Sequence, residues 1–177
     1  MRAFAVFSAL LLGFIPAASS QAVSEASVKA AYLYRFADYI DWSDQSFTTP
    51  DAPFVIGVMN ADEIEAAIVQ LTAGRRVGTH PIVPRVVRPG EPLQGVNMLF
   101  VGREAPERVR ATVAAAEKQG AIVVTEGEGG LESGSSINFV VAGNRVGFEV
   151  STVAAERSGH HISARMLAVA RRVVKGT

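Results

Sequence analysis

The pattern of apolar and polar positions near the start of the chain predicts an aromatic helix. Residues 27–42 read SVKAAYLYRFADYIDW and hold five aromatic side chains. At about 100° per residue, one face of such a helix carries an apolar stripe of Val28, Tyr32, Phe36 and Tyr39, with Leu33 and Ile40 beside it. Because aromatic side chains are scarce in the rest of the chain, we expect this stripe to pack against the core.

The opposite face of the same helix is more polar. It carries Tyr34, Ala37, Asp38 and Asp41. A tyrosine exposed among acidic side chains is a candidate contact for another protein, because exposed apolar groups often mark interaction sites. We therefore predict Tyr34, Asp38 and Asp41 as partner-binding residues.

Further along the chain, short continuous apolar runs alternate with helical patterns. The runs Phe54–Met59, Met98–Val101 and 121–125 are typical of strands that are buried on both faces. Helical spacing follows the first two runs, and Pro106 suits the first turn of the second of these helices. Strands that alternate with helices predict a mostly parallel sheet with helices on its faces.

Local signals refine two parts of this pattern. Asn60 follows the first run, and Glu63 three residues later completes the pattern of a capping box, so Asn60 is expected to cap the next helix. Residues 80–87 form a weaker strand pattern, because Pro81 and Pro84 lack the N–H groups that a central strand needs. We expect that segment to be an edge strand or irregular.

The last third of the chain changes to a hairpin pattern. Segments 137–142 and 145–150 flank Gly143-Asn144, a dipeptide typical of tight β-hairpins. Ser151 or Thr152 is expected to cap a short helix. Ser163 is expected to cap a last helix with an apolar stripe of Met166, Leu167, Ala170, Val173 and Val174. The predicted fold class is α/β: a single three-layer domain over residues 23–177, with a mostly parallel central sheet flanked by helices and a C-terminal β-hairpin followed by helices.

Residues 1–22 have the pattern of a secretory signal peptide. Arg2 supplies the positive charge, residues 3–15 form the apolar segment, and Pro16 precedes small and polar residues. That apolar segment is too short to span a membrane, which takes roughly 20 apolar residues. We expect export and cleavage after Ala22, with Ser20 as the alternative, and no transmembrane segment in the mature chain.

Composition narrows the range of partners. The chain has 17 basic and 17 acidic residues and no cysteine. It has no block of basic residues, so neither nucleic acid nor an anionic lipid surface is expected as a partner. Without cysteine the chain cannot form a disulfide, carry a lipid anchor on a thiol or sense redox state through one.

The sequence contains no motif that indicates catalysis, a cofactor or a metal. The glycine-rich loop 127–136 lacks the Gly-Lys-Ser/Thr ending of a phosphate-binding P-loop. The histidines, His80, His160 and His161, do not have the spacing of metal ligands, and no G-x-S-x-G nucleophile elbow occurs. We therefore predict that the protein is not an enzyme and needs neither cofactor nor metal.

The predicted sheet nevertheless offers a place for a small ligand. In open α/β sheets, ligands bind outside the carboxyl ends of the parallel strands. Here those ends lie near Asn60, Gly102 and Glu126. A small-ligand-binding domain with its pocket at these residues is the alternative to a protein that acts by binding a partner.

Two segments together resemble the YfiR-like family of exported proteins. Residues 29–42 (KAAYLYRFADYIDW) are similar to the opening block of that family, and residues 148–170 (FEVSTVAAERSGHHISARMLAVA) are similar to its closing block. The order of strand, glycine-rich loop and hairpin between the two blocks also matches. The resemblance therefore covers nearly all of the mature chain.

This resemblance implies a periplasmic regulator without catalytic activity. Well-understood members of the family repress an inner-membrane diguanylate cyclase, and so cyclic-di-GMP signalling, by binding its periplasmic sensor domain until another envelope protein sequesters them. By resemblance, the partner of this chain is the periplasmic domain of a membrane diguanylate cyclase or a related sensor. A second envelope protein that sequesters the chain is a further implied partner, and a homodimer is left open.

Overall fold

The computed structural model describes residues 24–176. The predicted signal peptide and its cleavage site lie outside the described residues. No helix in the described range is both long and apolar enough to cross a membrane.

A sheet of eight strands runs through the described residues in the order β10-β8-β7-β6-β5-β2-β4-β3. Five neighbouring strands are parallel: β2 (Phe54–Met59), β4 (His80–Val86), β5 (Met98–Val101), β6 (Ile122–Glu126) and β7 (Ile137–Ala142). The predicted hairpin returns as β8 (Arg145–Ser151), and β10 (Arg172–Val174) runs parallel to β8. The prediction of a mostly parallel central sheet is confirmed.

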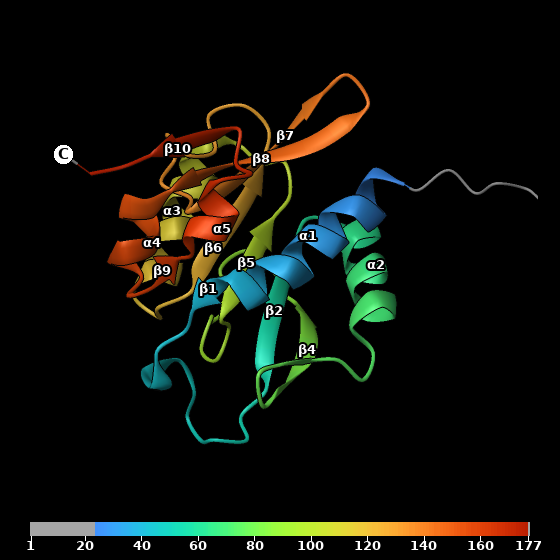
Figure 1. Cartoon of the computed structure of the whole chain (residues 1–177), viewed down its shortest axis with the longest axis vertical. Coiled ribbons are helices and arrows are strands. Elements are labelled where there is room, and N and C mark those ends of the chain that lie inside the picture. Colours follow the sequence, from blue (N-terminus) through green and yellow to red (C-terminus); the bar gives the residue numbers. More distant parts are fainter. Residues whose placement is uncertain (1–23, 177) are drawn as a thin grey trace, which may run out of the picture.

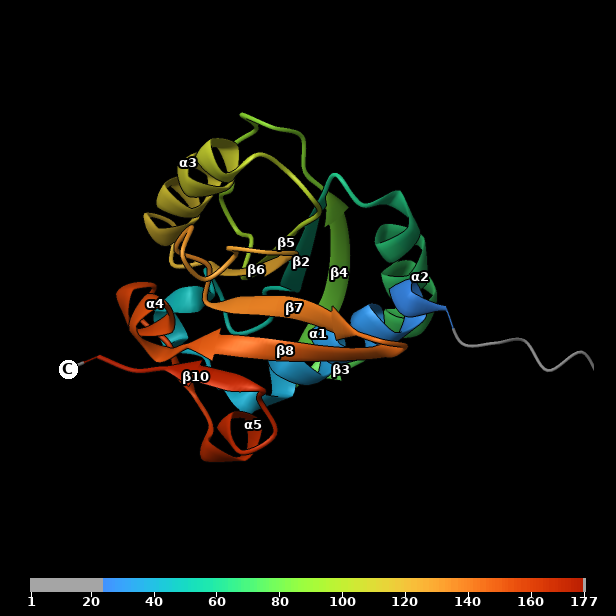
Figure 2. The ribbon, with the colours of Figure 1, turned by 90° about the horizontal axis from the view of Figure 1, so that it is seen from above.

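Helices cover both faces of this sheet (Figure 1). α1 (Glu25–Tyr39) and α2 (Asp62–Thr72) share one buried cluster with the sheet, to which α5 (Ala164–Leu167) contributes Met166. α3 (Pro106–Glu117) buries Val109, Val113 and Ala116 in a second cluster on the opposite face. Figure 2 shows α3 and α2 well apart, with β2 and β4 between them. The predicted three-layer architecture is therefore confirmed.

α1 buries a different face from the predicted stripe. Its buried apolar side chains are Ala30, Leu33, Phe36 and Ala37, whereas Tyr39 is 36% exposed. The helix packs against both the sheet and α2, so its contact surface is wider than one aromatic stripe, and the two alanines permit close approach. The prediction is correct for Phe36 and wrong for Ala37 and Tyr39.

The segment around Asn60 does not form the predicted capping box. α2 is capped by Ala61, without a side-chain hydrogen bond. Asn60 instead adopts a left-handed backbone with φ of 55°, and its side-chain amide donates to Glu104 at 2.9 Å. Asparagine tolerates this conformation better than most residues, so the polar side chain serves the turn between β2 and α2 rather than the helix end.

The prolines in β4 are accommodated at an edge of the sheet. β3 (Arg76–Val77) pairs with only the first two residues of β4, opposite His80 and Pro81. Beyond these two residues β4 has a neighbour on one side only, which is β2. The prediction of an edge strand for most of this segment is therefore correct, because an open edge does not require the missing proline N–H groups.

The last predicted helix is much shorter than expected and is followed by a strand. Ser163 caps α5 as expected, but α5 ends at Leu167, and Val173 and Val174 belong to β10. β8 would otherwise be the edge of the sheet, and β10 pairs with it in the register Val173 to Val150. β-branched residues favour this pairing over a further helical turn, and the partner strand lies too far away in sequence for the local pattern to show it.

The two ends of the domain are joined by a second, two-stranded sheet. β1 (Ile40–Asp41) continues from α1 and pairs antiparallel with β9 (His161–Ile162) after α4 (Thr152–Arg157). Trp42 lies beside this junction, with its ring centroid 4.8 Å from Phe54 and 4.7 Å from the buried His160. The opening block, residues 29–42, and the closing block, residues 148–170, are therefore one packed unit.

Candidate functional site

The structure separates the three predicted partner-binding residues. The partly buried Tyr34 ring lies beneath Arg75, whose guanidinium carbon is 5.1 Å from the ring centroid. Asp38 is exposed on α1, 3.9 Å from the Arg35 guanidinium. Asp41 is exposed in β1, beyond the end of α1. Tyr34 thus packs within the fold, while Asp38 and Asp41 are accessible.

An exposed apolar hollow of about 370 Å³ lies between α1 and α5, over β8. We call it the α1–α5 pocket, and its lining residues are Tyr32, Arg35, Phe36, Tyr39, Phe148, Arg165, Met166 and Val169. Val169 is 70% exposed although it is apolar, and it follows directly on the short α5. Every residue that lines this pocket comes from the opening or the closing block.

Aromatic packing makes the base of the α1–α5 pocket rigid. The Phe148 ring meets Phe36 edge-on, with the ring centroids 4.9 Å apart, and meets Tyr32 edge-on at 5.5 Å. Such edge-to-face pairs are favourable beyond the area that they bury. The exposed arginines Arg35 and Arg165 flank this base, one from α1 and one from α5.

The sequence pattern missed this pocket for a specific reason. A single long C-terminal helix, as predicted, would turn Val173 and Val174 to the same core as Met166. In the structure the helix stops at Leu167, and the turn that leads to β10 leaves Val169 exposed. Arg35 is the sequence feature that could have indicated the pocket, because a charged residue beside an aromatic stripe often marks the rim of an apolar surface.

A second hollow lies where the sheet topology reverses. The chain leaves β2 through α2 on one face, and leaves the neighbouring β5 through α3 on the other face. A cavity of about 560 Å³ opens beside the carboxyl ends of these strands. We call it the switch-point cavity, and its lining residues are Glu25, Ala26, Lys29, Asn60, Ala61, Asp62, Glu63, Ile64, Arg103 and Glu126.

Lys29 is the central side chain of the switch-point cavity. It is buried, which is unusual for a lysine. Its ammonium group, on α1, donates to carboxylate oxygens of Glu25 and of Glu126 at the end of β6. Burial alone would lower the pKa of Lys29, but the hydrogen bonds to Glu126 and Glu25 outweigh burial, and the pKa lies above its ordinary value.

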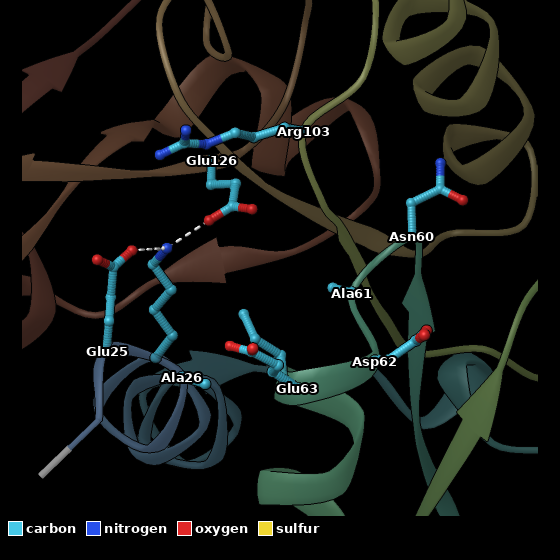
Figure 3. Close-up of a pocket in the computed structure, with 10 residues that line it drawn as sticks. Glu25, Ala26, Asn60, Ala61, Asp62, Glu63, Arg103 and Glu126 are labelled. Atoms are coloured by element: carbon cyan, nitrogen blue, oxygen red, sulfur yellow. Dashed lines mark hydrogen bonds and ion pairs between the residues drawn. The ribbon is translucent and has the colours of Figure 1, made fainter.

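Lys29, Glu25 and Glu126 form an ion triad, and the side chains around it point in different directions. Figure 3 shows Arg103 reaching over Glu126 and Glu63 pointing from α2 toward the cavity, whereas Asn60 and Asp62 point away. Neither Arg103 nor Glu63 takes part in an ion pair within the described range. Sequence reasoning placed Asn60 and Glu126 at this edge but missed Lys29, since a lysine on a helix is normally solvated.

Gly102 supports the cavity without lining it. Its amide donates to the Met59 carbonyl at 2.8 Å, and a Cβ at this position would clash with the Asn60 carbonyl oxygen. The loop after β5 can therefore pass directly beside the loop after β2 only because residue 102 is glycine. Of the three predicted pocket residues, Asn60 and Glu126 line the cavity, and Gly102 lies behind Asn60.

The histidines lie apart from both hollows. His80 stacks on Phe47 with ring centroids 3.5 Å apart, and its Nδ1 is 2.8 Å from the Ala52 carbonyl oxygen. His160 is buried against Trp42 and places Nε2 2.7 Å from the Gly120 carbonyl oxygen. Within residues 24–176, no group of three or more histidine, aspartate or glutamate side chains is arranged to hold a metal ion.

Comparison with known proteins places the chain in a family. No curated protein matches it. A family model described as YfiR/HmsC-like matches residues 26–171, which includes both blocks, the whole α1–α5 pocket and every lining residue of the switch-point cavity except Glu25. Membership of this family points to a regulatory role in the periplasm rather than to catalysis. With most of its length matched, the chain belongs to the YfiR/HmsC-like family.

Proposed function

We propose that this protein is exported to the periplasm and represses an inner-membrane signalling protein, in the first place a diguanylate cyclase, by binding its periplasmic sensor domain. The observation that carries the proposal is the α1–α5 pocket. It is an exposed apolar surface built only from the opening and closing blocks, inside the segment that matches the family. Exposed apolar surface with a polar rim is the usual mark of a protein-binding site.

The chemistry of the pocket defines the segment that it would bind. Its floor is aromatic, and Arg35 and Arg165 are the charged residues that line it. Tyrosine and arginine are the residue types that most often dominate binding energy at interfaces. The complementary segment of the sensor domain offers an apolar side chain to Val169 and Tyr39, with carboxylates beside it that pair with the arginines.

The predicted contact residues fit this surface to different degrees. Asp38 adjoins Arg35 at 3.9 Å and so lies beside the pocket. Asp41 and Tyr34 do not line it. We propose Asp38 as a rim residue that keeps Arg35 oriented, and we propose Asp41 and Tyr34 only as neighbours of the interface.

Repression follows if the pocket binds one conformation of the sensor better than the other. A ligand shifts an equilibrium only by its difference in affinity for the two states. Moving a cyclase from almost fully active to almost fully inactive needs a difference of about 5.5 kcal/mol. An envelope protein that covers the same pocket would relieve repression, and this is the role that we propose for a second partner.

Binding to the purified sensor domain tests the proposal. Val169→Asp replaces the most exposed apolar side chain of the pocket with a carboxylate and should weaken binding of the mature protein to the sensor domain by at least about ten-fold. Val69→Asp is the matched control, because Val69 is also exposed, at 50%, but lies on α2 outside the pocket. Equal affinities of the two variants would show that the α1–α5 pocket is not the interface.

Cellular cyclic-di-GMP tests the function itself. Deleting the gene should raise the cyclic-di-GMP level, and the rise should disappear when the cyclase gene is deleted as well. A plasmid copy of the wild type or of Val69→Asp should restore repression, while Val169→Asp should not. An unchanged cyclic-di-GMP level, together with no sensor recovered by pull-down from membranes, would contradict a repressor.

A further inference from the structure

We propose that the switch-point cavity binds a small zwitterion, with the acid group of the ligand at Arg103 and its ammonium group between Glu63 and Glu126. This site is separate from the α1–α5 pocket, since the two share no lining residue. Ligand binding at the switch-point cavity can therefore be tested independently of the proposed repressor function.

The first support is the position of the cavity. It lies at the carboxyl ends of parallel strands, between β2 and β5, from which the chain departs to opposite faces. This crevice, at the point where the strand order reverses, is where open α/β sheets bind their ligands. Its volume of about 560 Å³ lies in the range of small-molecule sites.

The second support is the built polar wall. Lys29 is buried, with 4% of its side chain exposed, and is held between carboxylates that come from α1 and β6. Burying an ammonium group is costly unless it is paired, and here the pairing fixes Glu126 in one place at the wall of the cavity. The Glu126 carboxylate is therefore preorganised, whereas Glu63 and Arg103 are exposed side chains at the mouth of the cavity.

The third support is the presence of both signs of charge around the cavity. Lys29 is shared by two carboxylates, so the triad with Glu25 and Glu126 keeps one excess negative charge. Glu63 adds a second carboxylate directed at the same space, and Arg103 supplies a cation above them (Figure 3). The cavity thus has the Arg103 guanidinium beside Glu126 on one side and the Glu63 carboxylate on the other.

This arrangement distinguishes between classes of ligand. A dianion would pair with Arg103 but would face Glu63 and Glu126 with like charge. A dication would pair with the carboxylates and face Arg103. A zwitterion satisfies both sides at once, and the arginine offers a bidentate contact to a planar carboxylate.

Titration calorimetry with four-carbon probes tests the charge pattern on the mature full-length protein. 4-Aminobutyrate, succinate and putrescine each have four carbons and carry one charge of each sign, two negative charges and two positive charges respectively. Glycine, β-alanine and 6-aminohexanoate then measure the spacing between the two charged sides. We expect at least one ω-amino acid of this series to bind about ten-fold or more tightly than both succinate and putrescine.

Variants test the two assigned contacts. Arg103→Met and Glu63→Gln should each weaken binding of the best ω-amino acid by about ten-fold or more. Arg110→Met is the matched control, because Arg110 is exposed on α3 and does not line the cavity. Circular dichroism melting of each variant separates loss of the site from loss of the fold.

Three results would overturn the inference. The first is that no ω-amino acid binds with a Kd below about 1 mM, where affinity is at the weak end of specific recognition. The second is that succinate or putrescine binds as tightly as the zwitterions. The third is that folded Arg103→Met and Glu63→Gln bind as well as the wild type.

Discussion

The α1–α5 pocket and the switch-point cavity are hollows of similar scale but opposite character. The first is lined by aromatic rings and methyl groups with arginines beside them, and its residues come from the two ends of the chain. The second is lined by ionised side chains at the ends of central strands. An apolar surface gains most when a partner covers it, while a charged site of this volume can select a small ligand. One domain therefore presents two different kinds of site on one scaffold.

Both hollows depend on α1, because Phe36 lines the pocket and Lys29 lines the cavity on the same helix. Phe36 is 2% exposed, and its ring contacts Tyr32, Phe139 and Phe148. Phe36→Ala should lower the free energy of unfolding by about 3–5 kcal/mol, which is the usual cost of a large-to-small change in a core. Urea unfolding measures this value.

Tyr39→Ala is the comparison for Phe36, since Tyr39 is on the same helix but 36% exposed. It should cost clearly less, because its ring leaves a smaller cavity behind and water already reaches it. If Phe36→Ala lowered stability by less than about 0.5 kcal/mol, the observed orientation of α1 would be contradicted.

Gly102→Ala should affect the cavity without touching the pocket. The added Cβ would clash with the Asn60 backbone carbonyl, which cannot rotate away as a side chain would. We expect a loss of about 1–3 kcal/mol of stability, because the loops after β2 and β5 must separate. Any zwitterion affinity should fall as well, while binding to the sensor domain should stay unchanged in the folded variant. Equal losses in both affinities would show that the two sites are coupled.

Much of the scaffold could be predicted from the sequence, because its strands are recognisable from short segments of sequence. β2 and β5 are continuous apolar runs, which identifies them as strands buried on both faces, and their carboxyl ends then locate Asn60 and Glu126 at one edge. The cavity could be placed in this way because it follows from topology. Its chemistry could not, because Lys29 meets Glu126 only after residues 97 positions apart are brought together.

The α1–α5 pocket was harder to predict because it depends on where α5 ends and on which face α1 buries. α5 ends after four residues, because residues 172–174 form the strand β10 and pair with β8, the second strand of the hairpin. The helical pattern of Met166 and Val173 is real in the sequence, but long-range pairing overrides it. The face of α1 was misjudged for a related reason, because α1 packs against α2 as well as against the sheet, and the helical pattern of α1 alone does not show this second surface.

Lys29→Met should reveal how far the ion triad stabilises the fold. The variant leaves the Glu126 carboxylate, 14% exposed, without its cation, so we expect a loss of about 1–2 kcal/mol near neutral pH. Because the pKa of Lys29 is raised in the folded state, its contribution is complete below the unfolded value of 10.5 and is lost as pH rises through the folded value. The difference in stability between wild type and variant should therefore be constant between pH 5 and pH 8 and should shrink in strong alkali. A difference that shrinks between pH 5 and pH 8 would contradict the triad.

Arg165→Met is the substitution with the smallest expected effect. It separates the electrostatic from the apolar contribution to sensor binding at the α1–α5 pocket. Arg165 is exposed on α5, so its attraction for a carboxylate on the sensor domain is screened by salt. We expect the variant to weaken sensor binding by less than about ten-fold, mainly through a slower association rate, and we expect the loss to fade as ionic strength rises. Val169→Asp should instead weaken binding at every salt concentration, because it removes apolar contact. Surface plasmon resonance over a range of salt concentrations measures both patterns. If the loss in Arg165→Met did not depend on salt, Arg165 would be buried in the complex. The sensor segment would then have to enter deeply between α1 and α5.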